Sequence, residues 1–314
     1  MNKIAMKAYG KINLSIDVLG TLENGYHEVE MVMQQVLLHD DILIRWFPDK
    51  RDRKDKNQVE IQLSTNKYYL PRDQRNLAYK AALVMIDNFG DGKNGRIRID
   101  IKKRIPVAAG LGGGSSNAAA VIHGLNKMWE LNLSVKELCK VGEALGADVP
   151  FAIMGQAKAN KNLELSGDPL ATHCAIARGT GTQLEPIAKG LNSYVVLIKP
   201  PISVSTPIVY KGIDEVEIPS HPDGMDLIKG LLEEDQKRIE KNMINVLENF
   251  TLKRYPIAMY TKNKVIAACA KSKVLMSGSG PTIFALCKDE EEAQGRCKVL
   301  SSENEETFWT RATF

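Results

Sequence analysis

The part of this chain best suited to chemistry is a glycine- and serine-rich run between Lys103 and Ala120, KRIPVAAGLGGGSSNAAA. Glycine lets backbone N–H groups wrap around an anion, and the N-terminus of a following helix adds a positive dipole end. The run therefore predicts a phosphate-binding loop. The alternative is a glycine-rich turn that caps a helix and binds no ligand.

Three common glycine motifs do not fit this run. No Gly-Lys-Ser or Gly-Lys-Thr occurs in the chain, which excludes the P-loop of nucleoside triphosphatases. Ser115 stands where a dinucleotide-binding G-x-G-x-x-G pattern needs its third glycine, and Asn117 stands where a hydrolase nucleophile elbow needs its last one. A phosphate loop of another type remains.

Two polar residues near the N-terminus and one aspartate form a second group of candidates. Residues 11–18 alternate between polar and apolar, so Lys11 and Asn13 lie on one face of an expected strand and could reach one ligand. The alternative is a solvated strand face. Asp148, in the run GADVPF, follows an expected helix end and precedes an expected apolar strand, which would partly desolvate its carboxylate. An acid that only shapes a turn is the alternative there.

A second glycine loop, SGSGPT, covers residues 277–282 between two expected strands. It could be a simple hairpin turn, or it could face the first glycine loop or a polyphosphate shared with it. Tyr26 and His27 follow an Asn-Gly turn near the N-terminus; a lone histidine beside a turn is more often a packing or surface residue than a ligand contact.

The elements that must position these residues alternate between strands and helices. We expect helices over 76–89, from Ala118 to Trp129, from a Ser134/Glu137 capping box to Gly146, and from residue 203 through Tyr210. Further helices are expected within 225–250 and 263–271. Strands are expected over 11–18, 97–101, 194–198, 274–276 and 283–287, and as a pair at 42–46 and 59–63 joined by a charged loop over 49–57. For residues 155–186 a domain junction, a mobile flap and a strand pair all remain open.

Composition narrows the functional classes. The 314 residues are 44% apolar and 25% charged with a formal charge of +4, which is typical of a globular protein without the basic footprint of a nucleic-acid binder. The five cysteines are widely spaced, which predicts reduced and mostly buried thiols rather than disulfides or a zinc site. No apolar run approaches 18 residues and the N-terminus lacks the apolar core of a signal peptide, so we expect a cytoplasmic protein.

Three blocks in order, KINL near the N-terminus, P-x-x-A-G-L-G-G-G-S-S-N-A-A and S-G-S-G-P-T, resemble the GHMP kinase superfamily over nearly the whole chain. The resemblance implies an α+β, two-domain GHMP kinase fold. Residues 1–155 would form an N-terminal domain like ribosomal protein S5 domain 2 with the ATP-binding glycine loop. Residues 156–314 would form the C-terminal α+β domain, with the active site in the cleft between the two.

Within the superfamily, GYHEV, GADVPF and KPPISVSTPIVY are similar to the members that phosphorylate a cytidine-diphosphate-linked sugar alcohol in the non-mevalonate isoprenoid pathway. By this resemblance Asp148 is the general base that takes the proton of the acceptor hydroxyl, and Lys11 lies beside it and keeps it ionised. ATP is the implied phosphoryl donor. No metal ligand is assigned, and Mg²⁺ is expected to be held mainly by phosphates and water.

The same resemblance implies the binding positions. The ATP-binding positions are Asn76, Leu77, Lys103, Pro106, Ala109, Gly110, Leu111, Gly112, Gly113, Gly114, Ser115, Ser116 and Asn117. The substrate-binding positions are Asn13, Tyr26, His27, Asp148, Thr206, Tyr210, Ser277, Gly278, Ser279 and Gly280. The two tyrosines would stack on the cytosine and His27 would hydrogen-bond to it.

One departure from the family pattern is an extra segment, roughly Gln156 to His173. Two other functions stay open: a GHMP kinase acting on mevalonate or homoserine, and a non-enzymatic module that binds nucleic acid. The expected partners are a small-molecule substrate, with no nucleic acid and no membrane, and the expected assembly is a monomer or weak homodimer.

Overall fold

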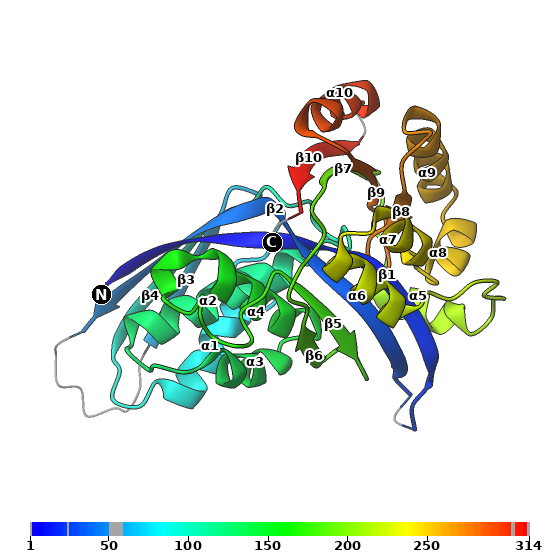
Figure 1. Ribbon diagram of the computed structural model, residues 1–314. Coiled ribbons are helices and arrows are strands. Elements are labelled where there is room, and N and C mark those ends of the chain that lie inside the picture. The colour runs from blue at the N-terminus through cyan, green and yellow to red at the C-terminus, as the bar shows by residue number, and fades with distance from the viewer. Residues whose placement is uncertain (1, 24, 50–58, 303–304, 313–314) are drawn as a thin grey trace. The chain divides into compact units, whose positions relative to one another are not determined.

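A computed structural model gives the fold of residues 2–23, 25–49, 59–302 and 305–312 (Figure 1). The chain divides into two compact units that are interleaved along the sequence. Unit 1 comprises residues 1–10, 39–105 and 112–172, and unit 2 comprises residues 11–38, 106–111 and 173–314. The long strands β1 (Lys3–Thr21) and β2 (His27–Pro48) each run through both units. The charged loop expected over 49–57 lies, apart from Asp49, outside the described residues.

The sheet of unit 1 is built on β4 (Gly95–Lys102), with the second half of β2 on one side and β3 (Val59–Thr65) on the other. β2 and β4 are antiparallel, with Ile42 opposite Ile101 and Ile44 opposite Ile99. β3 and β4 are parallel. The expected pairing of 42–46 with 59–63 is therefore wrong, because both strands pair with β4 instead of with each other.

Helices α1 (Leu77–Phe89), α2 (Gly113–Met128), α3 (Val135–Glu143) and α4 (Asp148–Ala159) cover one face of this sheet (Figure 1). Most of α2 is buried. A Cβ added at Gly124 would lie 2.4 Å from Cδ1 of Ile44, so the helix backbone rests almost directly on β2. The absence of a side chain at Gly124 thus lets α2 pack closely against the sheet.

The α3 capping box predicted from Ser134 and Glu137 is confirmed. The Ser134 hydroxyl accepts from the Glu137 N–H at 3.4 Å, and Glu137 Oε2 accepts from the Ser134 N–H at 2.8 Å. We expect Ser134→Ala to lower the free energy of unfolding by about 1 kcal/mol, because one N–H at the helix start loses its acceptor. Thermal denaturation measures this loss. Ser220→Ala, at an exposed position outside the helices, is the control and should leave Tm unchanged.

One predicted strand is a helix. Residues 148–159 form α4, with Asp148 as its first residue and Pro150 in its first turn. Proline is tolerated in the first turn because its missing N–H would have no partner inside the helix. The apolar run after Asp148 is short, and a short apolar run does not separate a buried helix from a buried strand.

In unit 2, four antiparallel strands lie in the order β10 (Glu306–Arg311), β7 (Tyr194–Lys199), β9 (Ile283–Cys287) and β8 (Val274–Met276). The helices of this unit are α5 (Thr206–Ile213), α6 (Gly224–Glu233), α7 (Gln236–Asn242), α8 (Glu248–Arg254), α9 (Pro256–Ala268) and α10 (Glu290–Leu300). The first half of β2 pairs with β5 (Cys174–Arg178), and β5 pairs with β6 (Gln183–Pro186). The strand-pair alternative for residues 155–186 is therefore confirmed for its second half.

The five cysteines are free thiols, and three of them are buried, as expected. Burial raises the pKa of Cys139 and of Cys287 to about 12, so both stay protonated at neutral pH. Among the helices described here, none combines the length and the hydropathy needed to cross a bilayer.

Candidate functional site

The glycine loop opens directly into helix α2. Gly110 and Gly112 have φ values of 72° and 66°, a left-handed conformation that glycine adopts without strain. The helix begins at Gly113, five residues before the expected start at Ala118, so Ser115 and Ser116 lie in its first turn. Gly112 caps the helix without a side-chain hydrogen bond among the described residues. The N–H groups of this turn can therefore face an anion.

The two serines of this turn differ. Ser116 is buried, and its hydroxyl donates to the backbone carbonyl of Tyr9. Its own carbonyl accepts from Gln156 Nε2 at 2.7 Å. Ser115 is only half-buried. Ser116 thus ties the helix to β1, which leaves Ser115 as the better placed hydroxyl for a phosphate group.

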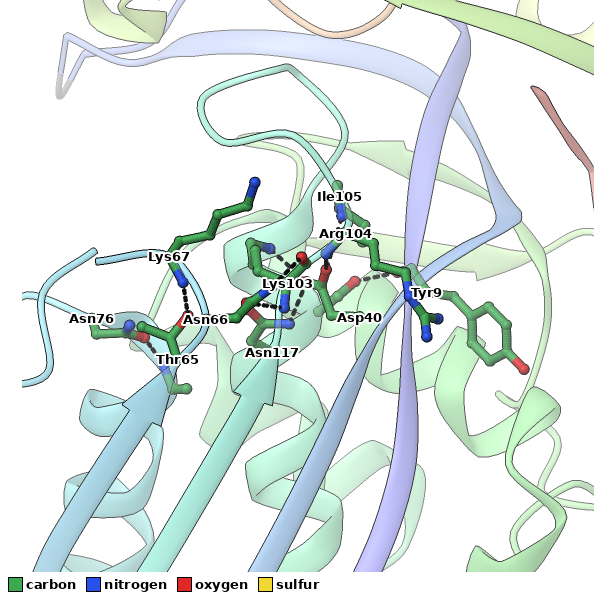
Figure 2. A network of polar contacts seen from close by, with 12 residues as sticks. Tyr9, Asp40, Thr65, Asn66, Lys67, Asn76, Lys103, Arg104, Ile105 and Asn117 are labelled. Atoms are coloured by element: carbon green, nitrogen blue, oxygen red, sulfur yellow. Dashed lines mark hydrogen bonds and ion pairs between the residues drawn. The ribbon is translucent and has the colours of Figure 1, made fainter. Parts of the chain in front are cut away.

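A buried polar network lies beside the start of α2 (Figure 2). Asp40 on β2 is fully buried; its Oδ2 accepts from Lys103 Nζ at 2.5 Å and from Asn117 Nδ2 at 2.8 Å. A Cβ added at Gly113 would lie 2.7 Å from Lys103 Nζ, so the ammonium rests against the first turn of α2. Burial lowers the pKa of Lys103, and the adjacent Asp40 carboxylate opposes that shift.

Asn76 and Leu77, predicted from the resemblance, lie at the N-terminus of α1. Asn76 caps the helix, with its Oδ1 accepting from the Ala78 N–H at 3.0 Å and its Nδ2 donating to the Pro71 carbonyl at 2.9 Å. Leu77 Cδ1 lies 3.3 Å from the position of a Cβ on Gly114. The structure thus brings Leu77, Lys103 and the start of α2 together within unit 1.

In unit 2, Lys11 and Asn13 are buried, which removes the solvated strand face as an alternative. Lys11 Nζ donates to Asn13 Oδ1 at 2.7 Å, and the Lys11 N–H donates to the carbonyl of Leu111 at 3.0 Å. A Cβ on Gly278 would lie 3.6 Å from Lys11 Nζ. The ammonium therefore lies close to the second glycine loop.

The two glycine loops are in contact. This is the alternative in which the second loop faces the first one. The Ser277 hydroxyl donates to the Gly110 carbonyl at 2.9 Å, and a Cβ on Gly110 would lie 2.2 Å from the Ser277 carbonyl oxygen. Buried Asn245 holds the second loop, because its Nδ2 donates to the carbonyls of Met276 and Gly278, both at 2.8 Å.

A histidine and a tyrosine predicted to hold the acceptor lie together in unit 2. His27 and Tyr210 have ring centroids 5.4 Å apart. His27 Nε2 lies 2.9 and 3.0 Å from the two carboxylate oxygens of Asp214. Tyr26 is 66% exposed. The hydroxyls of Thr206 and Ser279, also predicted, lie 2.8 Å apart.

Asp148 is half-buried at the first position of α4. A carboxylate at a helix N-terminus is stabilised in its charged form by the helix dipole. The first position of α4 is therefore a favourable one for a carboxylate.

Three residues of the site region were not predicted from the sequence: Asp40, Asp214 and Asn245. Asp40 has the same strand parity as Ile42 and Ile44, which marks it as a carboxylate on the buried face of β2. Asp214 follows Tyr210 by four residues and so shares its helix face. Asn245 carries no comparable signal.

The extra segment belongs largely to unit 1. Asn160 pairs with the edge of β1, with its Oδ1 accepting from the Lys7 N–H and its Nδ2 donating to the Lys7 carbonyl, both at 3.1 Å. Asn162 Nδ2 donates to the carbonyl of Ala5 at 3.0 Å. Asn160 and Asn162 therefore tie the segment to β1, and His173 begins a stretch of unit 2.

The described residues contain no cluster of three or more His, Cys, Asp or Glu side chains able to hold a metal ion. The first turn of α2 supplies N–H and hydroxyl groups, which suit phosphates. This donor set fits a Mg²⁺ ion that arrives bound to a nucleotide, in a site that adds few protein ligands of its own.

Comparison with known families and relatives gives consistent matches. Residues 76–156 match the N-terminal domain of GHMP kinases, and residues 227–304 match the C-terminal domain of GHMP kinases. The 4-diphosphocytidyl-2-C-methyl-D-erythritol kinase of Alkaliphilus metalliredigens is 43% identical, and the alignment covers 96% of this chain and 94% of the relative. The enzyme of the same name from Clostridioides difficile is 41% identical, over 93% of this chain and 90% of its own.

Solved structures share the fold. A crystal structure of 4-(cytidine 5'-diphospho)-2C-methyl-D-erythritol kinase has a TM-score of 0.75 and 27% identity, covering 99% of this chain and 100% of that one. A homoserine kinase from Cytophaga hutchinsonii has a TM-score of 0.66 at 20% identity, covering 100% of this chain and 95% of that one. The second likeness shows the fold alone.

Proposed function

This chain belongs to the GHMP kinase family, and from that premise we propose that it transfers the γ-phosphoryl group of ATP to the 2-hydroxyl of 4-diphosphocytidyl-2-C-methyl-D-erythritol, in non-mevalonate isoprenoid synthesis. The observation that carries the proposal is the 43% identity to a kinase of that name over 96% of this chain. The grouping of His27, Tyr210 and Asp214 supports it from the side of the acceptor.

In the proposed reaction Asp148 takes the proton of the acceptor hydroxyl. An alcohol has a pKa far above 7, so a positioned carboxylate must accept this proton as the new oxygen–phosphorus bond forms. The bond between the γ-phosphorus and the β,γ-bridging oxygen breaks, and its electron pair leaves with ADP. Lys11 supplies positive charge to the reacting phosphoryl group.

We assign ATP binding to the first glycine loop, to the first turn of α2 and to the N-terminus of α1. Gly110 to Ser116 hold the phosphates through backbone N–H groups, and Ser115 offers its hydroxyl to a phosphate or to Mg²⁺. Asn76, Leu77 and Lys103 contact the nucleotide beside the first turn of α2. Mg²⁺, when bound with ATP, neutralises charge that develops on the phosphates, and it is held mainly by those phosphates and water.

We assign the acceptor to unit 2. The rings of Tyr26 and Tyr210 stack on the cytosine, and His27 reads its edge. Because Nε2 of His27 is directed at Asp214, Nδ1 is the ring nitrogen that would hydrogen-bond to the cytosine edge. Asn13, Thr206 and the Ser277–Gly280 loop contact the remaining polar groups of the substrate.

A coupled assay with ATP and each candidate acceptor tests this function. We expect turnover with 4-diphosphocytidyl-2-C-methyl-D-erythritol and none with mevalonate or homoserine, because neither offers a base to stack or read. Turnover of mevalonate or homoserine in the absence of turnover of the cytidylated alcohol would overturn the proposal.

Tyr210→Ala should raise KM for the cytidylated acceptor by about 10- to 100-fold, because base–aromatic stacking contributes about 1–3 kcal/mol. KM for ATP should stay unchanged. Steady-state kinetics with each substrate varied in turn measures both values. Tyr260→Ala, which removes an exposed ring on α9, is the matched control; a loss as large there would contradict the role of Tyr210.

We further propose that the chain works in the cytoplasm on a small molecule, without nucleic acid or membrane partners, as a monomer or weak homodimer. The division into domains at 1–155 and 156–314 also stays a prediction.

A further inference from the structure

Asp40 is a buried carboxylate whose hydrogen-bonding capacity is fully engaged inside unit 1 (Figure 2). Its Oδ1 accepts from the backbone N–H groups of Arg104 at 2.7 Å and Ile105 at 2.9 Å. Its Oδ2 accepts from Lys103 Nζ at 2.5 Å and Asn117 Nδ2 at 2.8 Å. A single side chain on β2 therefore fixes the chain that follows β4 and the second turn of α2.

The cation held by Asp40 lies where an anionic ligand would bind. Lys103 is only 6% exposed, and its ammonium rests against Gly113 at the start of α2. The N–H groups of that turn carry the positive end of the helix dipole. The Lys103 ammonium and the positive end of the α2 dipole thus lie side by side. The buried negative charge of Asp40 compensates the ammonium, which would otherwise be unfavourable at this buried position.

The charged surroundings of Lys103 are otherwise sparse. The first turns of α1 and α2 contain no acidic residue. Lys67, on the connection after β3, points away from Lys103 in Figure 2. Arg104, next in the chain, pairs with Asp41 at 2.7 Å. Among the residues that the structure describes here, Asp40 is the carboxylate that compensates Lys103.

We propose that Asp40 is a positioning residue for the nucleotide: it holds Lys103 charged and fixed against the first turn of α2, so that ammonium and helix dipole act together on bound ATP. This inference rests on the proposed kinase function. It differs from a purely structural ion pair, which would tie β2 to α2 without influencing nucleotide affinity.

Asp40→Asn tests the proposal because the amide is nearly isosteric and its oxygen can still accept the two backbone N–H groups. We expect KM for ATP to rise by about tenfold or more at pH 8, with kcat and the acceptor KM little changed. The variant-to-wild-type ratio of ATP KM should grow between pH 7 and 9. Burial lowers the pKa of Lys103, and without Asp40 nothing opposes that shift, so the ammonium loses its proton as the pH rises.

Two comparisons separate positioning from stability. Asp100→Asn removes a carboxylate that pairs with Arg98 at 3.2 Å on the same sheet, and it should leave the ATP KM unchanged at every pH. In a Lys103→Met background, Asp40→Asn should add nothing further to the ATP KM. An Asp40→Asn enzyme with lower Tm but a wild-type, pH-independent ATP KM would overturn the proposal.

A measurement on the unmodified chain covers the case in which Asp40→Asn does not fold. With lysines labelled at Cε, the Lys103 resonance, assigned with Lys103→Arg, should shift when a non-hydrolysable Mg-ATP analogue saturates the protein, while the Lys102 resonance stays. A Lys103 signal that does not move would overturn the proposal. The analogue binds without any acceptor, so this result is independent of whether the cytidylated alcohol is turned over.

Discussion

Replacing Asp148 by Asn is expected to lower kcat by about 10²–10⁴-fold, the usual contribution of a positioned general base. The amide keeps the size of the side chain at the start of α4 but cannot take the acceptor proton. Affinity for nucleotide should be largely retained, because the proposed ATP contacts lie elsewhere in the chain. Single-turnover kinetics together with equilibrium binding of a Mg-ATP analogue measures the two effects separately.

Asp87→Asn, an exposed carboxylate on α1, is the matched control and should leave kcat unchanged. The same variants address the nucleic-acid alternative. Unchanged turnover in Asp148→Asn would refute the assignment of this residue. Tight, salt-dependent RNA binding in that variant would then favour a nucleic-acid-binding module instead.

Gly110→Ala should be the most damaging change in the glycine loop. The φ of 72° disfavours any side chain, and the new Cβ would lie 2.2 Å from the Ser277 carbonyl oxygen, which belongs to backbone and cannot rotate away. We expect a loss of about 2–4 kcal/mol in the free energy of unfolding. Because the two loops must also separate, kcat/KM should fall by about 10²-fold.

Gly295→Ala is the control, because the same substitution there should raise the stability of the protein instead of lowering it. Gly295 is exposed within α10, and a Cβ there meets no atom within 4 Å. The substitution should stabilise the protein by about 0.5–1 kcal/mol without changing activity. Thermal denaturation and steady-state kinetics compare both variants. Equal Tm values for Gly110→Ala and the wild type would show that the loop contact is looser than the geometry indicates.

Helices and strands could be predicted where residues close together in the chain determine the type of element. The α3 capping box and the strand over residues 11–18 follow from side chains close to each other in the chain, and both are confirmed, although the polar face of that strand is buried and not solvated. The strand predicted after Asp148 is wrong because the apolar residues there fit a buried helix and a buried strand equally well. The pairing of 42–46 was wrong because the choice of strand partner depends on contacts distant in sequence.

In the candidate site, the residues within compact motifs could be predicted and the isolated supporting ones could not. The glycine loop is visible because its four glycines and two serines are adjacent in the chain. Asp40 and Asn245 act on groups 63 and 31 residues away, respectively. Their partners become known only when the strands are paired. The position of Asp40 on the apolar face of β2 does, however, indicate a buried carboxylate that needs partners.

The interleaving of the two units also constrains how the chain is made. Residues 31–34 emerge early in synthesis, but the β5 residues they pair with, 174–177, follow about 140 positions later. A nascent chain that ends near Thr172 would hold all of unit 1 while the first half of β2 still lacked β5. Loop closure over this distance is slow, and an unpaired strand edge attracts other chains. Cotranslational protection of this strand should therefore matter more for the yield of folded protein than it would for two domains that follow each other in sequence.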